Sequence, residues 1–313
     1  MSVQGQSRRS VLGGMCLLPM LTSCTSAALD ELSLAAGEPG GFYAEFADLL
    51  AAVSRSAGWP LRPVTTGGSR SNAELVIRGG ADVGLALTDL VLAARAGVSP
   101  FAAPLELLAI GRLYENYLQL AVRSSAPFIR LADLAGRVVS LGTPGSGASL
   151  LGTRLVAAAG IAVRACELNL AAATAALADG RIDAFLWSGG VPTPAVSALV
   201  GQSPVRLLPL AEHLPALRAR YGAGPYSTAV MPAGVYGAAT PIATIGVANL
   251  LVAAPTLPGR AAEALARLLV ERASDLVPAA ALGIQYFDQP VLVDTGDVPL
   301  HPGAAVAYRK LHG

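Results

Sequence analysis

The chain has 313 residues, of which 22 are basic, 21 are acidic and 53% are apolar. This length exceeds what one hydrophobic core usually serves, so it predicts two domains. The net charge of +1 gives no field that attracts nucleic acid, and we exclude nucleic-acid binding as a main role. Lysine occurs only at Lys310, which removes phosphate-loop and Schiff-base enzymes from consideration.

The first residues have the pattern of an export signal. Arg8 and Arg9 form the pair typical of twin-arginine signals, and a short apolar stretch runs from Val11 to Leu21. Leu21-Thr22-Ser23-Cys24 resembles a bacterial lipobox, which predicts a lipid on Cys24. We therefore expect an export signal over 1–23, a tether over 24–31, and a periplasmic or cell-envelope location with a lipid anchor.

Cysteine usage leaves no disulfide in the mature chain. Cys16 lies in the signal and Cys24 is the predicted lipid site, so Cys166 has no partner. We expect Cys166 to be a small buried apolar residue.

Strands and helices alternate from residue 32 onward. Strands are expected over 32–36, 61–66 and 83–87, each followed by a turn and a helix. In the helix expected over 42–56, apolar residues recur every three or four positions and give one buried face. This alternation predicts an α/β fold with parallel strands and right-handed crossovers.

Two longer strands, over 105–114 and 117–123, are expected to enter a second lobe. There the alternation restarts, with strands over 137–141, 165–168, 184–187 and 205–208, and helices ending at Ala159, over 171–178, near Pro194 and over 211–220. The Gly-rich segment 222–240 predicts the return, before a buried strand pair from Ile242 and a helix over 258–276. We therefore expect lobe I over 32–116 plus 236–313 and lobe II over 117–235, with separate sheets and at least two crossings.

Four turns join a strand to a helix and carry small or polar residues: Gly40-Gly41, Gly67-Gly68-Ser69, Thr88-Asp89 and Gly145-Ser146-Gly147. In open α/β sheets this end of the strands borders the ligand crevice, and the free amides of a helix start favour an anion. The turns together predict one cleft for a negatively charged ligand. For any single turn, glycine that merely permits a tight bend remains the alternative.

Enzyme motifs are incomplete. After Gly145 and Gly147 the dinucleotide-binding spacing requires glycine at position 150, which is Leu150. Ser146 lacks the Gly-x-Ser-x-Gly frame, and His213, His301 and His312 are too scattered for a triad or a metal site. We expect no catalysis, no cofactor and no metal.

Short motifs follow one another in a fixed order along the mature chain. They are Gly40-Gly41-Phe42-Tyr43, Thr66-Gly67-Gly68-Ser69 with Asn72, Gly79-Gly80-Ala81-Asp82-Val83-Gly84, Leu113-Tyr114-Glu115, Leu131 to Ser140, Gly142 to Gly147, Asp179 to Phe185, Gly190 to Pro194 and Pro299 to Ala304. Their order and spacing resemble the TAXI-type solute-binding proteins of TRAP transporters.

The resemblance implies the two-lobed type II periplasmic-binding-protein fold, a Venus flytrap that binds a small organic acid or amino acid. It also implies delivery of that ligand to a sodium-driven TRAP membrane permease. A ligand-sensing partner of a membrane receptor shares every feature, and an enzyme on the same scaffold with a cofactor on Cys166 is a less favoured alternative. Ala148 and Arg70 depart from residues common in the family, so the ligand is not carried over.

The expected ligand-binding residues come from the turns, from aromatic side chains at element ends and from nearby polar groups. Ser69 and Ser146 offer hydroxyl donors. Arg70 offers a bidentate contact, with a solvated side chain as the alternative, and Asp89 and Glu115 offer a partner for a ligand amine or a helix cap. For Tyr43, Tyr114 and Trp187, packing in the core is the alternative to lining the cleft. The full set is Gly41, Tyr43, Gly68, Ser69, Arg70, Asn72, Thr88, Asp89, Tyr114, Glu115, Ser146, Gly147, Trp187 and Gly190.

Overall fold

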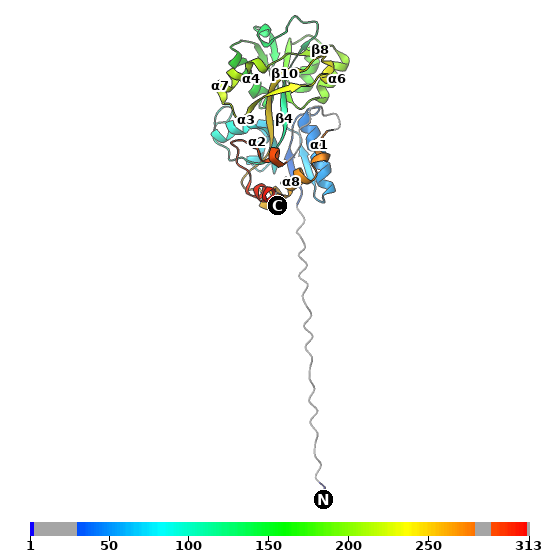
Figure 1. Ribbon diagram of the computed structural model, residues 1–313, viewed down its shortest axis with the longest axis vertical. Helices are drawn as coiled ribbons and strands as arrows, with labels where there is room; N and C mark the ends of the chain where they lie inside the picture. Colours follow the sequence, from blue (N-terminus) through cyan, green and yellow to red (C-terminus); the bar gives the residue numbers. More distant parts are fainter. Residues whose placement is uncertain (3–29, 279–288, 312–313) are drawn as a thin grey trace.

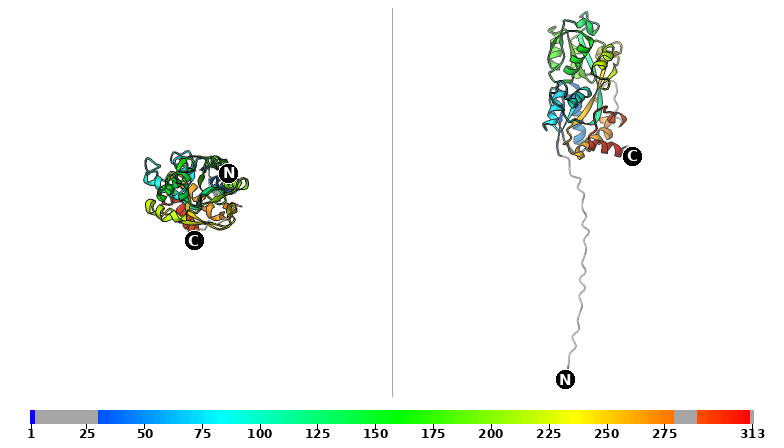
Figure 2. Two further views of the ribbon diagram at one scale, coloured as in Figure 1. Left: turned by 90° about the horizontal axis from the view of Figure 1, so that it is seen from above. Right: turned by 90° about the vertical axis from the view of Figure 1, so that its left-hand side faces the viewer.

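Two α/β halves stack along the long axis of the computed structural model, which describes residues 1–2, 30–278 and 289–311. In Figure 1 the lower half contains the blue and cyan beginning of the described fold together with its orange and red end. The green and yellow middle of the chain forms the upper half, and Figure 2 shows the same stacking from another side. Cys24 and most of the predicted signal and tether lie outside the described residues.

The lower half begins with the predicted alternation of strands and helices. Parallel strands lie in the order β2-β1-β3, and all residues of β3 are buried, as expected for a strand covered on both faces. The elements are β1 (Leu32–Ala35), α1 (Phe42–Ser56), β2 (Leu61–Val64), α2 (Ser69–Ile77), β3 (Val83–Leu87) and α3 (Thr88–Ala96). The predicted strands and the α/β class are confirmed here.

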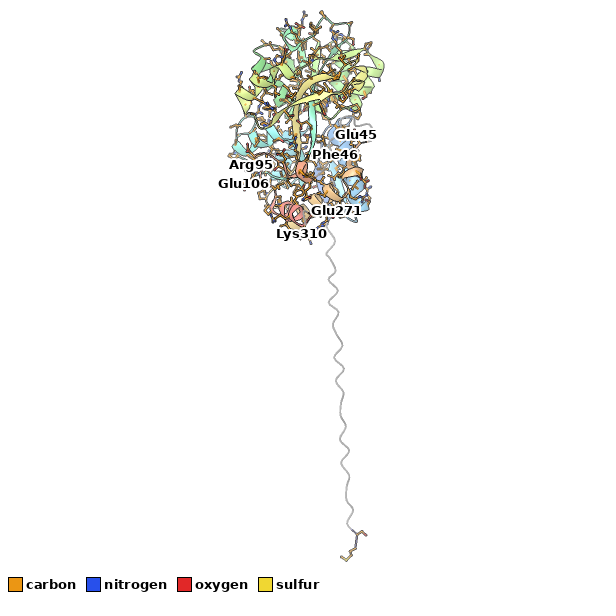
Figure 3. All side chains as sticks on the ribbon, in the orientation of Figure 1. Glu45, Phe46, Arg95, Glu106, Glu271 and Lys310 are labelled. Atoms are coloured by element: carbon orange, nitrogen blue, oxygen red, sulfur yellow. The ribbon has the colours of Figure 1, made fainter. Side chains whose placement is uncertain are left out.

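The apolar residues of helix α1 form one buried face of the helix, as the sequence pattern predicted. Phe46 and Leu50 are fully buried, whereas Asp48 on another face is exposed. In Figure 3 Phe46 lies in the lower half, and the labelled charged side chains belong to the same half. Burying one such apolar side chain contributes about 1.5–3 kcal/mol. This stripe therefore fixes α1, and with it the turn at Gly41 where the helix begins.

The upper half repeats the alternation. Strand β5 pairs in parallel with both β6 and β7, and β8 pairs antiparallel with β4. The elements are β5 (Val138–Ser140), α4 (Gly147–Ala159), β6 (Arg164–Cys166), α5 (Leu170–Ala178), β7 (Ala184–Gly189), α6 (Pro194–Gln202), β8 (Val205–Leu207) and α7 (Leu214–Tyr221). Cys166 lies in β6 at the end of the strand order and is half-buried, so the expectation of a buried cysteine was wrong.

Two long strands run through both halves. The strands expected over 105–114 and 117–123 are one strand, β4 (Leu108–Arg123), and the strand pair expected from Ile242 is also one strand, β10 (Ile242–Ala253). β4 reaches β7 in the upper half, and β10 reaches β3 in the lower half. The segment predicted to return to the lower half instead contains β9 (Tyr226–Met231), an antiparallel partner of β10.

These crossings join the strands into one ten-stranded sheet. The expectation of two separate sheets was therefore wrong, because β4 and β10 pair with each other as they pass from one half to the other. The expected lobe boundaries between residues 116 and 117 and between residues 235 and 236 stay a prediction.

The chain ends with helices on the lower half. The helix expected over 258–276 ends earlier, at Glu271, and a 3-10 turn follows it. Tyr308 of the last helix donates a hydrogen bond to the Ile110 carbonyl of β4 at 3.0 Å, which ties the carboxyl end to the crossing strand. The helices are α8 (Gly259–Glu271), α9 (Gln289–Val293) and α10 (Pro302–Leu311).

Among the described residues, no helix combines the length and apolar character needed to cross a membrane.

Candidate functional site

A cavity of about 30 Å³ lies between the halves, where three helices begin. A water molecule needs roughly 10–15 Å³ of such volume, so in this conformation the cavity holds only about two water-sized groups. Its lining is Gly37, Glu38, Gly41, Phe42, Tyr43, Gly67, Gly68, Ser69, Leu87, Asn116, Ser146, Gly147, Ala148, Trp187, Ser188 and Gly189.

The helix starts supply amide donors to this cavity. Gly41, Gly68 and Ser146 are the residues that precede α1, α2 and α4. No described residue accepts a hydrogen bond from the amides of Gly147 or Ala148. Helix starts carry partial positive charge as well as free amides, so they favour a carboxylate or another anion.

Glycine is required where the two halves approach each other. Gly68 has a φ of 110°, which side chains rarely tolerate. A Cβ atom on Gly147 would lie 2.4 Å from Leu87 Cδ1 and 3.1 Å from Ser69 Oγ, both in the lower half. These glycines let the start of α4 meet the start of α2.

A chain of hydrogen bonds runs behind the cavity from one half to the other. Leu87 N donates to Ser69 Oγ at 3.2 Å, and Ser69 Oγ lies 3.1 Å from Tyr43 Oη, which donates to Asn249 Oδ1. Asn249 Nδ2 donates to Asn116 Oδ1 at 2.6 Å, and Asn116 Nδ2 lies 3.4 Å from Ser188 Oγ.

The direction of this chain decides which hydroxyls face a ligand. Because the Tyr43 proton goes to Asn249, the Ser69 proton is the one that lies between Ser69 and Tyr43. Burial raises the pKa of Tyr43, so its hydroxyl stays neutral. Ser146 Oγ accepts from Ser149 N at 3.1 Å and keeps its own proton, which makes Ser146 the better hydroxyl donor to a ligand.

Among the described residues that line the cavity, only Glu38 has a charged side chain. Its Oε1 accepts from the Thr143 hydroxyl, and its Oε2 accepts from Leu170 N at 2.9 Å. Both donors belong to the upper half. The sequence analysis missed Glu38 because it stands in a Gly-Pro-rich turn with no motif of its own.

Seven of the expected ligand-binding residues line the cavity, and seven lie outside the lining. The first set is Gly41, Tyr43, Gly68, Ser69, Ser146, Gly147 and Trp187. The second set is Arg70, Asn72, Thr88, Asp89, Tyr114, Glu115 and Gly190.

Three of the outer residues support the cavity wall. The Asn72 amide donates to the carbonyls of Ala36 and Leu85 and so joins the residue after β1 to the middle of β3. The Tyr114 ring packs on Phe42 with centroids 4.7 Å apart, and a Cβ atom on Gly190 would lie 2.5 Å from the same phenyl ring. These contacts hold the start of α1 in place.

Arg70 and Glu115 are engaged in ion pairs instead. Arg70 Nε lies 2.9 Å from Glu74 Oε1, and its guanidinium lies over the Phe101 ring at 5.9 Å. Glu115 Oε2 lies 3.0 Å from an Arg112 guanidinium nitrogen. Arg70 therefore makes no bidentate contact toward the cavity.

Asp89 belongs to a second contact between the halves. Its Oδ2 lies 3.1 Å from Arg154 Nη1 of α4 and 3.2 Å from Tyr226 Oη of β9. Burial raises the pKa of Asp89, and the neighbouring Arg154 opposes that shift. Thr88 beside it donates to the Ala248 carbonyl at 2.9 Å. Both side chains join elements rather than face the cavity.

The described residues contain no group of three His, Cys, Asp or Glu side chains that could hold a metal ion. Burial raises the pKa of the Cys166 thiol, which is opposite to the shift that activates a cysteine nucleophile.

Comparison with solved structures identifies the fold. A protein from Bordetella bronchiseptica RB50 matches with a TM-score of 0.56 and 16% identity, over 91% of this chain and 99% of that one. The periplasmic binding protein BugD matches with a TM-score of 0.53 and 15% identity, over 77% and 81%. The alkanesulfonate-binding protein SsuA from Xanthomonas axonopodis pv. citri is 21% identical over 80% and 78%, with a TM-score of 0.48. The fold is that of the type II periplasmic binding proteins.

A family model then identifies the particular group within that class. The chain belongs to the NMT1-like family, whose model matches residues 34–310.

Proposed function

We propose that this chain is the solute-binding subunit of a TAXI-type TRAP transporter and that it binds a small organic acid or amino acid between its halves. The bound ligand is then delivered to the membrane permease. The motif order along the mature chain supports the TAXI subtype, and the fold of the periplasmic binding proteins supports solute binding without catalysis.

One observation carries the ligand class. The cavity is lined by the starts of α1, α2 and α4, and the amides of Gly147 and Ala148 at the start of α4 have no acceptor among the described residues. Unpaired amides at a helix start are suited to a carboxylate, which supplies the missing acceptors. The hydroxyl proton of Ser146 adds a third donor at the same place.

Export and lipid anchoring at Cys24 are the proposed localisation, supported by Arg8, Arg9 and the lipobox-like residues before Cys24. Cys24→Ala should leave the protein exported but released from the membrane, as fractionation of cells measures. Unchanged membrane retention would count against the anchor.

Thermal unfolding in the presence of organic acids, amino acids and sugars tests the ligand class. We expect one or more carboxylates to raise the melting temperature, because a ligand that binds only the folded state stabilises it by mass action. A hundredfold excess of ligand over its dissociation constant stabilises by about 2.7 kcal/mol. Stabilisation by neutral sugars alone would contradict the carboxylate assignment.

A further inference from the structure

Glu38 combines two properties that no other described residue of the cavity shares. It brings a full negative charge to a lining otherwise made of glycines, hydroxyls, amides and apolar side chains. It also reaches across the closed cleft, from the turn before α1 to Thr143 and Leu170 of the upper half.

The contacts across the cleft fix the carboxylate without saturating it. A carboxylate has about four positions for accepting hydrogen bonds, and Thr143 and Leu170 occupy one on each oxygen. Leu170 is the first residue of α5, so its amide belongs to a helix start that favours this charge. Both contacts therefore hold the Glu38 carboxylate in place, and it keeps room for a further donor.

Two parts of the cavity lining carry opposite charge: the start of α4 is partly positive and the Glu38 side chain is negative. The amides of Gly147 and Ala148 call for an anionic group on the ligand, whereas Glu38 repels one and accepts a donor. No Lys or Arg of the described residues lines the cavity to offset Glu38. A second anionic group on the ligand therefore finds no cation in this lining and meets the negative charge of Glu38.

We propose that Glu38 determines the ligand's class: it favours a carboxylate that carries an ammonium or hydroxyl group beside it and rejects a dicarboxylate. The inference rests on the proposed function, because it concerns a carboxylate bound at the start of α4. Glu38 is thus a specificity residue as well as a contact that closes the cleft.

Binding of two matched series of acids by calorimetry tests this inference. The first series is acetate, glycolate, glycine and malonate, which differ only in the group beside the carboxylate, and the second carries the same four groups on butanoate. Wild-type protein should prefer the ammonium and hydroxyl members of a series and bind the dicarboxylate most weakly. Glu38→Gln should weaken the ammonium member by roughly ten- to a hundred-fold, the factor of one charge-assisted hydrogen bond, and strengthen the dicarboxylate.

Two control variants separate selection from closure. Thr143→Val removes one contact of Glu38 but keeps its charge, so it should lower the affinity for all members of a series by a common factor. Glu38→Asp keeps the charge and should keep the order of preference.

The outcomes distinguish the inference from the proposed function. If Glu38→Gln keeps the wild-type order, or lowers all affinities equally as Thr143→Val does, Glu38 does not select the ligand although carboxylate binding stands. If wild-type protein binds no acid of either series and no carboxylate of the thermal screen, the carboxylate site itself is refuted, and the role of Glu38 falls with it.

Discussion

At the scale of single residues, Ser146 is the donor to test first. Its oxygen caps α4 by accepting from Ser149 N, and its proton remains for a ligand. Ser146→Ala should weaken a carboxylate ligand by roughly ten- to a hundred-fold, since a hydrogen bond to a charged group contributes about 1.5–3 kcal/mol. Calorimetric titration with the ligand found in the thermal screen measures this change.

Loss of the helix cap is a separate effect of the same substitution. It should lower the free energy of unfolding by about 1 kcal/mol. Asp133→Ala provides the control, because Asp133 Oδ2 caps a short turn of the upper half by accepting from Ile129 N at 2.8 Å and from Arg130 N at 3.1 Å, and Asp133 does not line the cavity. The control should lose stability and keep ligand affinity; equal affinity losses in both variants would argue against a direct contact by Ser146.

The sequence predicted the backbone of the site better than its side chains. Turns such as Gly67-Gly68-Ser69 were identifiable because glycine between a strand and a helix has few other uses. Whether Asp89 turns into the cleft or pairs with Arg154 depends on two residues 65 positions apart, which no local pattern encodes. One sequence signal could have indicated the role of Asn249, because it is a polar residue inside an otherwise apolar strand. A buried polar side chain needs hydrogen-bond partners, so such a residue points to a network around it.

At the scale of elements, strand positions were predictable and strand continuity was not. Asn116 and neighbouring Glu115 interrupt the apolar pattern of β4, and this suggested two strands instead of one. In the fold, Asn116 is buried because Asn249 on the adjacent strand β10 donates to it. A polar residue that ends a strand by local criteria can therefore sit in its middle when a partner strand supplies the hydrogen bond.

The residue that precedes helix α10 should make the free energy of unfolding depend on pH. His301 precedes the helix, and its Nδ1 accepts a hydrogen bond from Gly303 N at 3.1 Å. Burial lowers the pKa of His301 below its ordinary value of about 6.5. Between the lowered folded value and about 6.5 the unfolded chain binds more protons than the folded one, so the free energy of unfolding falls as pH falls through that window.

Chemical denaturation at pH 7, 6 and 5 measures this dependence. His301→Asn keeps a side-chain acceptor before α10 but does not titrate, so its loss of stability on acidification should be smaller than that of wild-type protein. Identical slopes for wild type and His301→Asn would refute the assignment.

At the scale of the whole molecule, closure is held by contacts on both sides of the cavity. Glu38 ties the turn before α1 to the upper half, and Asp89 pairs with Arg154 between α3 and α4. Between them, Arg70 N donates to the Gly145 carbonyl at 3.0 Å. These contacts between the halves include backbone groups and one ion pair, which form only at short range. The closed arrangement therefore depends on how closely the two halves approach each other.

Gly147→Ala should disturb that approach and the cavity together. The added methyl group would lie 2.4 Å from Leu87, a fully packed residue that itself lines the cavity. Either the halves move apart or Leu87 moves into the space for the ligand, and both weaken binding. Overpacking of this kind costs about 1–3 kcal/mol, so we expect a roughly five- to hundred-fold loss of affinity.

Small-angle scattering with and without ligand tests the closure itself. Wild-type protein with ligand should have a radius of gyration that matches this closed arrangement, whereas Gly147→Ala should keep a larger value or bind too weakly to close. Gly201→Ala is the matched control, because apart from its chain neighbours and the backbone of its own helix no atom lies within 4 Å of the position of its added Cβ in α6. There alanine should raise stability by about 0.5–1 kcal/mol without altering affinity. If Gly147→Ala binds as tightly as wild-type protein, the start of α4 does not need to reach β3 for the cleft to close.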